Sequence, residues 1–312
     1  MNHDQSGSQG YITGSVVSLH AGPSEDAEVV TQAKMGETFR VIEEAAAGWW
    51  RVALDYDGYS GYMPASAGRL VRTTPGVPDG PSVPSVPGKP GVPGVPDVPG
   101  IPAAASEMDF RTQPAVVRNL FSNVYSGPTI KSRLLVTLPI GVKVRLHPQA
   151  RATVQANEWL AVSLPNGMQG FMHTGDLTTN GQEWAWTTGA ELRANLVHTA
   201  RRFLGIPYRW GGTSSFGVDC SGFVQLLYRL HGLFLPRDAH EQGQYEKTFP
   251  INRTDLVPGD LIFFNNYGHV GMAISHFEFI HATTRGSPVV QISDVDDPYY
   301  SQERCDIRRY QL

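Results

Sequence analysis

The sequence predicts two small all-β barrels followed by an α+β domain in which helices precede an antiparallel sheet. Two observations predict this architecture. The first part of the chain contains two similar copies of a short-strand pattern, and from about residue 190 the pattern changes to helices and then to strands. With 312 residues, 41% of them apolar and 17% charged, the chain has the composition of a globular protein of two or three domains.

The two strand-rich copies are expected to form barrels over residues 11–74 and 105–180. Each copy alternates β-branched or aromatic residues with polar ones, as in "FRVIEE" and "VKVRLH", and turn residues interrupt the alternation. Units of this size with short strands fit a small barrel, and we interpret them as an internal duplication. Glycines lie fourteen residues apart in both copies (Gly22 and Gly36, Gly127 and Gly141), and a tryptophan precedes a glycine by eleven in both (Trp50 and Gly61, Trp159 and Gly170). The copies differ by a four-residue insertion between these two halves.

A stretch rich in Pro, Gly and Val, residues 75–104, separates the two barrels. Its Gly-x-Pro triplets are too few to hold a collagen triple helix, so we expect an extended polyproline segment. This segment is expected to act as a semi-rigid linker.

The α+β domain is expected over residues 190–312. The segment "ELRANLVHTARRFLG" places apolar residues three or four apart, on one face of a helix. A second helix is expected from about Cys220 to His231, with Gly232 after its last turn. The strand-like segments "DLIFF", "HVGMAIS", "EFIHAT", "VVQISDV" and "CDIRRYQL" follow, and we expect them to form an antiparallel meander.

Cys220 lies at the start of the second helix, directly after the glycine-rich segment "YRWGGTSSFGVD". The first turn of a helix offers unpaired N–H groups and the positive end of the dipole, which favour an anion. We therefore expect a lowered thiol pKa and a sulfur that can act as a nucleophile at neutral pH. The alternative is a small buried apolar cysteine, and the polar flanking residues Asp219 and Ser221 argue against it.

Two histidines could supply the base that a cysteine nucleophile needs. His269 opens the segment "HVGMAIS", and His281 lies in "EFIHAT". If these strands form a hairpin that turns near Ser275, residues whose numbers sum to about 550 face each other, which places the two imidazoles side by side. One ring could then take the thiol proton while the other orients it. The sequence thus predicts a Cys-His-His site.

Composition and motifs exclude several classes of function. The net charge of −4 and the lack of a basic run in the sequence argue against nucleic acid and against an anionic membrane surface as partners. The sequence has no Cys/His cluster with metal-ligand spacing and no GxGxxG motif behind a strand, so we expect neither a metal nor a cofactor.

The two cysteines do not suggest a disulfide framework, and we expect a monomer. The residues after Met1 lack an apolar signal segment, and 18 apolar residues never run together in the sequence. The chain is therefore expected to be cytoplasmic, or to have lost a leader.

Motifs of the C-terminal domain resemble, in the same order, those of NlpC-type cysteine peptidases, a papain-like family that cuts bacterial cell-wall peptides. They are "YRWGGTSSFGVDCSGFVQLLY", "LPRDAHEQ", "LVPGDLIFF", "GHVGMAI" and "FIHAT". The upstream barrels resemble bacterial SH3-like domains, and the whole layout is similar to that of γ-D-glutamyl-L-diamino acid endopeptidases. The resemblance implies that Cys220 is the nucleophile, His269 its base and His281 the residue that orients the base. It also implies that Tyr208 supplies a hydroxyl near the oxyanion, beside the backbone N–H of Cys220.

The resemblance further implies a set of residues that bind the peptide. Asp219 is expected to hold the free α-amine of the substrate, because a buried ammonium requires a carboxylate. The first barrel is expected to close one end of the groove, so that only a peptide with a free N-terminal L-Ala fits. The sequence departs from its relatives at Ala239, where they often carry Ser, and in a longer Pro/Gly linker. The expected groove residues are Trp210, Asp219, Ser221 and Asp238, with Tyr59 and Glu28 from the first barrel.

We therefore expect a cysteine peptidase that hydrolyses the γ-D-glutamyl to L-diamino acid bond of murein peptides, in the recycling of cell-wall peptides. Two alternatives stay open. The chain could be a catalytically inactive cell-wall-binding protein, or an amidase or acyltransferase that uses the same triad. The presence of Cys220, His269 and His281 together favours an active enzyme over the binding protein.

Overall fold

The computed structural model describes residues 5–71, 114–147, 158–178 and 188–311. The predicted linker, residues 75–104, lies outside these ranges, as do both ends of the predicted second barrel. The chain divides into two compact units. One comprises Met1–Glu28 with Ala33–Glu183, and the other comprises Val29–Gln32 with Trp184–Leu312.

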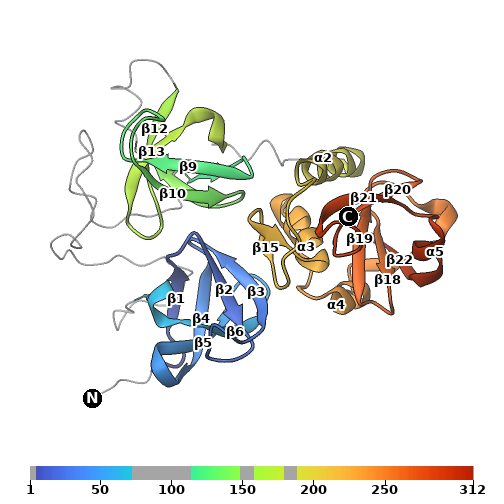
Figure 1. The fold of residues 1–312 in the computed structure, drawn as a ribbon, viewed down its shortest axis with the longest axis horizontal. Coiled ribbons are helices and arrows are strands. Elements are labelled where there is room, and N and C mark those ends of the chain that lie inside the picture. Colours follow the sequence, from blue (N-terminus) through green and yellow to red (C-terminus); the bar gives the residue numbers. More distant parts are fainter. Residues whose placement is uncertain (1–4, 72–113, 148–157, 179–187, 312) are drawn as a thin grey trace. The chain divides into compact units, whose positions relative to one another are not determined.

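The first unit begins with a seven-stranded antiparallel sheet (Figure 1). Its order is β3-β2-β6-β5-β4-β1-β7. Alternation builds the sheet, since Phe39 and Val41 of "TFRVIEEA" are buried while their neighbours face solvent. Gly10 and Gly68 lie against the ring of Phe39, where a Cβ would clash. The strands are β1 (Gln9–Ile12), β2 (Val16–His20), β3 (Val29–Lys34), β4 (Thr38–Ala45), β5 (Trp49–Leu54), β6 (Ser60–Pro64) and β7 (Gly68–Leu70).

A second seven-stranded sheet follows in the same unit, and its order is β10-β9-β13-β12-β11-β8-β14. This is the order of the first sheet with each strand replaced by the one seven places later, as an internal duplication requires. Gly170 is the second residue of β13, as Gly61 is of β6, and the two glycines pair with Val162 and Val52 respectively. The strands are β8 (Pro114–Val117), β9 (Phe121–Tyr125), β10 (Leu134–Pro139), β11 (Lys143–Leu146), β12 (Trp159–Ser163), β13 (Gln169–His173) and β14 (Leu177–Thr178).

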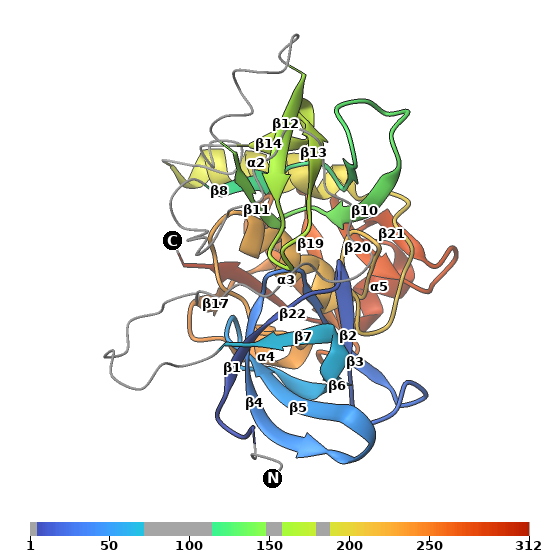
Figure 2. The ribbon, with the colours of Figure 1, turned by 90° about the vertical axis from the view of Figure 1, so that its left-hand side faces the viewer.

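The second unit contains the α+β domain (Figures 1 and 2). Its helices are α2 (Gly189–Arg202), α3 (Cys220–Leu230), α4 (Ala239–Gln244) and α5 (Pro298–Glu303). Its strands are β15 (Thr213–Ser214), β16 (Gly217–Val218), β17 (Thr248–Pro250), β18 (Leu261–Phe264), β19 (His269–Ala273), β20 (Glu278–Thr283), β21 (Val289–Asp294) and β22 (Arg304–Tyr310). Short 3₁₀ turns in the chain are η1 (Ala46–Gly48), η2 (Ala65–Ala67), η3 (Thr174–Asp176) and η5 (Arg253–Asp255).

The six-stranded sheet of this domain has the order β17-β22-β18-β19-β20-β21, with all neighbours antiparallel. The expected meander is therefore only partly correct. Strands β18 to β21 follow one another, but β22 returns to the opposite side and pairs with β18 rather than with β21. The short helix α5, which the sequence analysis missed, lies in the connection between β21 and β22.

Helices α2 and α3 bury the apolar faces that the spacing of their apolar residues predicts. Thr188 caps α2 by accepting a hydrogen bond from the backbone N–H of Glu191 (3.2 Å), and Leu192 and Leu196 are buried. Helix α3 lies against β19 and β20, and it is buried along nearly its whole length. The helix that begins with Cys220 is thus a fixed part of the core.

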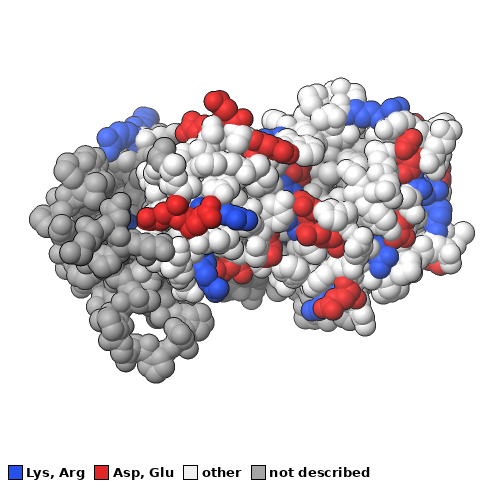
Figure 3. Space-filling model, turned by 90° about the horizontal axis from the view of Figure 1, so that it is seen from below, with Lys and Arg blue, Asp and Glu red and all other residues white. Residues whose placement is uncertain are grey.

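Acidic and basic side chains are interspersed on the face of the molecule in Figure 3. This mixture agrees with the small net charge of −4. Within the described ranges, every helix is too short or too polar to cross a bilayer.

Candidate active site

Cys220 is the first residue of α3, and Asp219 is the residue that caps this helix. The carboxylate of Asp219 accepts a hydrogen bond from the backbone N–H of Gly222 (2.6 Å), one of the donors that a helix start leaves unpaired. Gly222 must be a glycine, because a Cβ there would collide with the carbonyl oxygen of Gly212. The glycine-rich loop therefore lies directly on the first turn of α3 and fixes the place of Cys220.

The sulfur of Cys220 lies beside strand β19. Backbone N–H groups of Val270 and Ser221 donate hydrogen bonds to it, and Val270 is the residue that follows His269. Cys220 is nevertheless only 9% exposed, and burial together with the neighbouring Asp219 raises its pKa to about 11. The expected lowering of this pKa is therefore wrong for the resting protein. Removal from water and the carboxylate of Asp219 outweigh the two N–H donors and the charge of Arg237.

His269 and His281 contact each other, with 2.7 Å between Nε2 of His269 and Nδ1 of His281. The register differs slightly from the expected one. Met272 pairs with Ile280, so paired residue numbers sum to 552 and the two histidines are diagonal neighbours instead of directly opposite. A shift of two residues keeps both side chains on the same face of the sheet, so their rings still meet. The other ring nitrogen of His281, Nε2, lies 3.1 Å from Oγ of Ser293.

Burial keeps both imidazoles neutral. It lowers the pKa of His269 to about 4, and the nearby carboxylate of Asp219 only partly offsets this effect. The pKa of His281 is lowered further below its ordinary value, first by burial and then by His269. At neutral pH the thiol of Cys220 and both imidazoles are thus uncharged, and proton transfer from Cys220 to His269 stays a prediction.

Tyr208 approaches the same helix start from the glycine-rich loop. Its backbone N–H donates to the carbonyl of Pro288 (2.7 Å), and it forms a bridge with Val218. Burial raises the pKa of its hydroxyl well above the ordinary value, and the charges of Cys220 and Asp219 raise it further. The hydroxyl therefore keeps its proton and remains a hydrogen-bond donor at every physiological pH, and its role near the oxyanion stays a prediction.

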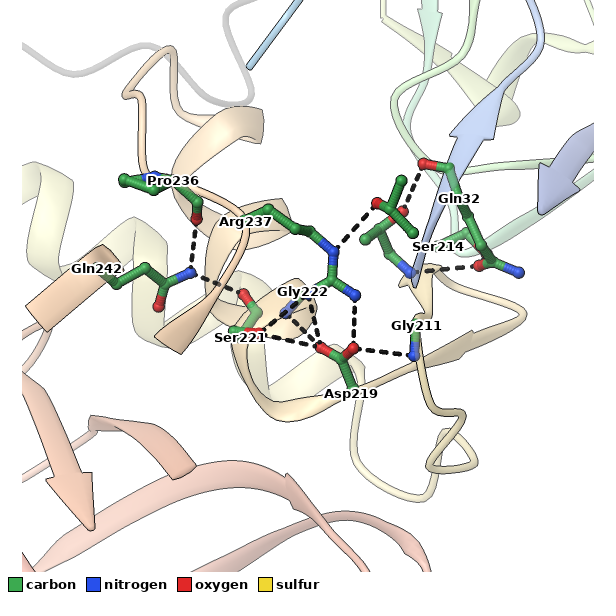
Figure 4. A network of polar contacts seen from close by, with 11 residues as sticks. Gln32, Gly211, Ser214, Asp219, Ser221, Gly222, Pro236, Arg237 and Gln242 are labelled. Atoms are coloured by element: carbon green, nitrogen blue, oxygen red, sulfur yellow. Dashed lines mark hydrogen bonds and ion pairs between the residues drawn. The ribbon is translucent and has the colours of Figure 1, made fainter. Parts of the chain in front are cut away.

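Asp219 forms a buried ion pair that sequence reasoning missed (Figure 4). Arg237 donates from Nη2 to Oδ2 (2.5 Å) and from Nη1 to Oδ1 (3.1 Å), in the two-pronged geometry that suits a guanidinium and a carboxylate. Oδ2 also accepts from the backbone N–H of Gly211 (3.0 Å), and Oδ1 accepts from Oγ of Ser221 (3.3 Å). With the N–H of Gly222, these donors surround the carboxylate on both oxygens.

The predicted groove residues differ in what they contact. Asp219 and Ser221 are 7% and 6% exposed, and they point into the network around Arg237 (Figure 4). Trp210 is 62% exposed, and Asp238 is partly exposed at the N-cap of α4, where its carboxylate makes no capping bond. Substrate binding by all four residues stays a prediction, but only Trp210 and Asp238 present substantial surface to a ligand.

The predicted groove residues of the first barrel, Glu28 and Tyr59, lie in the other compact unit. Glu28 is exposed just before β3, and Tyr59 is partly exposed just before β6. Their role in closing the groove stays a prediction.

Four residues of β3, Val29–Gln32, belong to the same unit as the α+β domain. Thr31 accepts a hydrogen bond from Nε of Arg237 (3.1 Å). The side chain of Gln32 accepts from the backbone N–H of Thr213 (3.2 Å) and from Oγ of Ser214 (3.2 Å). The strand segment thus completes the polar shell around Arg237 (Figure 4).

Two residues of the site, Arg237 and Ser293, were missed by sequence reasoning. A signal existed for Arg237, because it lies in the motif "LPRDAHEQ" next to the predicted groove residue Asp238. For Ser293 the signal is weak, because a serine in a strand is ordinary and only the register brings it to His281. Among the described residues, no cluster of three or more His, Cys, Asp or Glu side chains could hold a metal ion.

Removal of the Arg237 guanidinium should destabilise the protein strongly. We expect Arg237→Leu to lower the free energy of unfolding by about 3–5 kcal/mol, because it leaves the buried carboxylate of Asp219 without its counter-ion. The matched control is Arg253→Leu, which breaks an ion pair with Asp296, a residue whose side chain is 55% exposed. That variant should lose about 1 kcal/mol or less. Urea denaturation of the full chain measures both values, and equal losses would contradict the assignment.

The thiol of Cys220 should be alkylated slowly in the free protein at neutral pH. Its pKa of about 11 leaves little thiolate at pH 7, and the rate should rise as the pH approaches 11. The free, exposed Cys305 in the same chain serves as the internal reference. Iodoacetamide labelling followed by peptide mass spectrometry gives both rates. Faster labelling of Cys220 than of Cys305 at pH 6 would show that the sulfur is already ionised at rest, against this expectation.

Comparison with known proteins places this geometry in a family. The family model "NlpC/P60 family" matches residues 205–309, and the model "Bacterial dipeptidyl-peptidase Sh3 domain" matches residues 19–67, in the first barrel. A solved structure of an NlpC/P60 family protein from Bacillus cereus ATCC 10987 has the same fold, with a TM-score of 0.71 and 23% identity over 97% of this chain and 100% of that chain.

Two curated relatives are similar in sequence. "Gamma-D-glutamyl-L-lysine dipeptidyl-peptidase" of Bacillus cereus is 33% identical over 60% of this chain, and the match spans only 54% of the relative's length. "Probable endopeptidase" of Haemophilus influenzae is 41% identical over 37% of this chain and 73% of the relative. The second match covers most of that protein. The chain therefore belongs to the NlpC/P60 family of cysteine peptidases.

Proposed function

We propose that the protein hydrolyses the γ-D-glutamyl to L-diamino acid bond of murein peptides that carry a free N-terminal L-Ala. The observation that carries this proposal is the contact between His269 and His281 next to the helix start that presents Cys220. The name of the Bacillus cereus relative, a γ-D-glutamyl-L-lysine dipeptidyl-peptidase, supports the choice of bond.

The reaction begins with transfer of the Cys220 thiol proton to His269. The sulfur then attacks the γ-carbonyl carbon, and the oxyanion accepts hydrogen bonds from the backbone N–H of Cys220 and from the hydroxyl of Tyr208. His269 returns its proton to the leaving amine of the diamino acid, which breaks the amide bond and leaves a thioester. Water, deprotonated by His269, hydrolyses the thioester and restores the thiol.

The free amine of the substrate requires a carboxylate in the groove. Asp219 is already neutralised by Arg237, so a second cation beside it would gain little. Asp238 is the other carboxylate of the predicted set in this unit, and it is partly exposed. We therefore place the amine on Asp238, which changes the role first expected for Asp219.

Selection of a free amine has a consequence for the source of the substrate. In intact murein the L-Ala nitrogen is part of an amide bond to the glycan, so it cannot carry the positive charge that such a site selects. We propose that the protein acts on peptides already released from the glycan, in their recycling inside the cell.

Product analysis tests the proposed reaction. Incubation with L-Ala-γ-D-Glu-diamino acid peptides should release L-Ala-γ-D-Glu, detected by mass spectrometry, and acetylation of the N-terminus should slow cleavage by at least about 10-fold. Cys220→Ala should lose turnover by about 10³-fold or more with the fold retained, while Cys305→Ala should stay active. Equal cleavage of free and acetylated peptides would contradict the amine requirement, and substantial cleavage by Cys220→Ala would contradict the assigned nucleophile.

A further inference from the structure

Ser293 forms the end of a chain of polar contacts that starts at His269. His281 contacts His269 through Nδ1 (2.7 Å) and Ser293 through Nε2 (3.1 Å), and it is fully buried. Its ring packs between Phe279 and Tyr300, with centroids at 4.5 and 5.4 Å. Both ring nitrogens of His281 therefore have a partner inside the protein, and the ring has little freedom to move.

The proton on His281 can sit on only one of its two nitrogens, because a neutral imidazole has one donor and one acceptor. Burial and the neighbouring His269 keep the pKa of His281 well below its ordinary value, so the ring is neutral. Two arrangements satisfy both contacts. Either His281 donates from Nε2 to Ser293 and accepts at Nδ1 from His269, or every donor and acceptor along the chain is reversed.

Base catalysis selects the first arrangement. After His269 takes the thiol proton it carries a proton on both nitrogens, so its Nε2 must donate to Nδ1 of His281. His281 must then hold its own proton on Nε2, and that proton needs an acceptor. Oγ of Ser293 is the acceptor at hydrogen-bonding distance. In the reversed arrangement the Nδ1 of His281 would present a proton to an imidazolium, which is repulsive.

We propose that Ser293 is a positioning residue, whose hydroxyl accepts the Nε2 proton of His281 and so fixes the tautomer that lets His269 act as a base. The inference rests on the proposed function for its catalytic consequence, but the tautomer is a property of the resting protein. Strand pairing supports the placement, since Ser293 lies opposite Phe279 and is therefore a diagonal neighbour of His281 on the same face.

Three substitutions separate a positioning role from a structural one. Ser293→Ala removes the acceptor and should lower kcat by at least about 10-fold with KM little changed, because a positioned base contributes about 10²- to 10⁴-fold. Ser293→Thr keeps a hydroxyl, suits a strand, and should restore most of kcat. The control Ser301→Ala removes a hydroxyl that donates to the carbonyl of Pro298 in α5, and it should leave kcat unchanged.

Long-range ¹H–¹⁵N correlation spectra of the full chain, labelled with ¹⁵N-histidine, report the tautomer directly. We expect His281, assigned by comparison with His281→Gln, to carry its proton on Nε2 in the wild type and to gain the Nδ1-protonated form in Ser293→Ala. A wild-type ring protonated on Nδ1, or a Ser293→Ala protein with unchanged tautomer or unchanged kcat, overturns the proposal. If the wild type shows the expected tautomers but cleaves no murein peptide, the proposed substrate is wrong while the placement of Ser293 stands.

Discussion

The position of the nucleophile depends on one buried carboxylate. Asp219 caps α3 through the backbone N–H of Gly222, holds the glycine-rich loop through Gly211, and is itself neutralised by Arg237. Without these partners the buried carboxylate of Asp219 would be costly, because an isolated buried charge is unstable. Together they fix the loop, the helix start and a segment of β3 around a single group. Cys220 follows Asp219 directly, so the contacts of Asp219 also fix the backbone position of Cys220.

Features that depend on local pattern could be predicted from the sequence, and features that depend on long-range packing could not. Alternation gave the strands, and the flanks of Cys220 gave its place at a helix start. The hairpin register was two residues off, yet the period of two kept the histidines together. The return of β22 to β18 was missed because the last strand of a sheet need not pair with the strand before it. Arg237 reaches Asp219 from the loop before α4, and Ser293 reaches His281 through the pairing of β20 with β21; spacing in the sequence reveals neither contact.

The error on the thiol pKa has a physical cause that also explains how the site can work. A helix start stabilises an anion, but that argument assumes solvent nearby, whereas Cys220 is buried with two neutral rings. A neutral thiol and imidazole avoid the cost of separated charges in a dry site. In the proposed reaction, charge develops only when the sulfur attacks, and backbone N–H groups with the Tyr208 hydroxyl are the proposed hydrogen-bond donors to it. Cys220, His269, His281 and Ser293 are all uncharged in this resting state.

The late return of β22 also bears on how the enzyme is made. Strand β18 pairs with β19, which carries His269, on one side and with β22 on the other, and β22 is the last strand of this sheet along the chain. Along the chain, Arg304–Tyr310 comes after Cys220 and both histidines, so translation adds this strand after them. The nascent chain therefore has an exposed β18 edge and an incomplete sheet. The sheet that carries both histidines is therefore closed on its β18 side by a segment that is made after them.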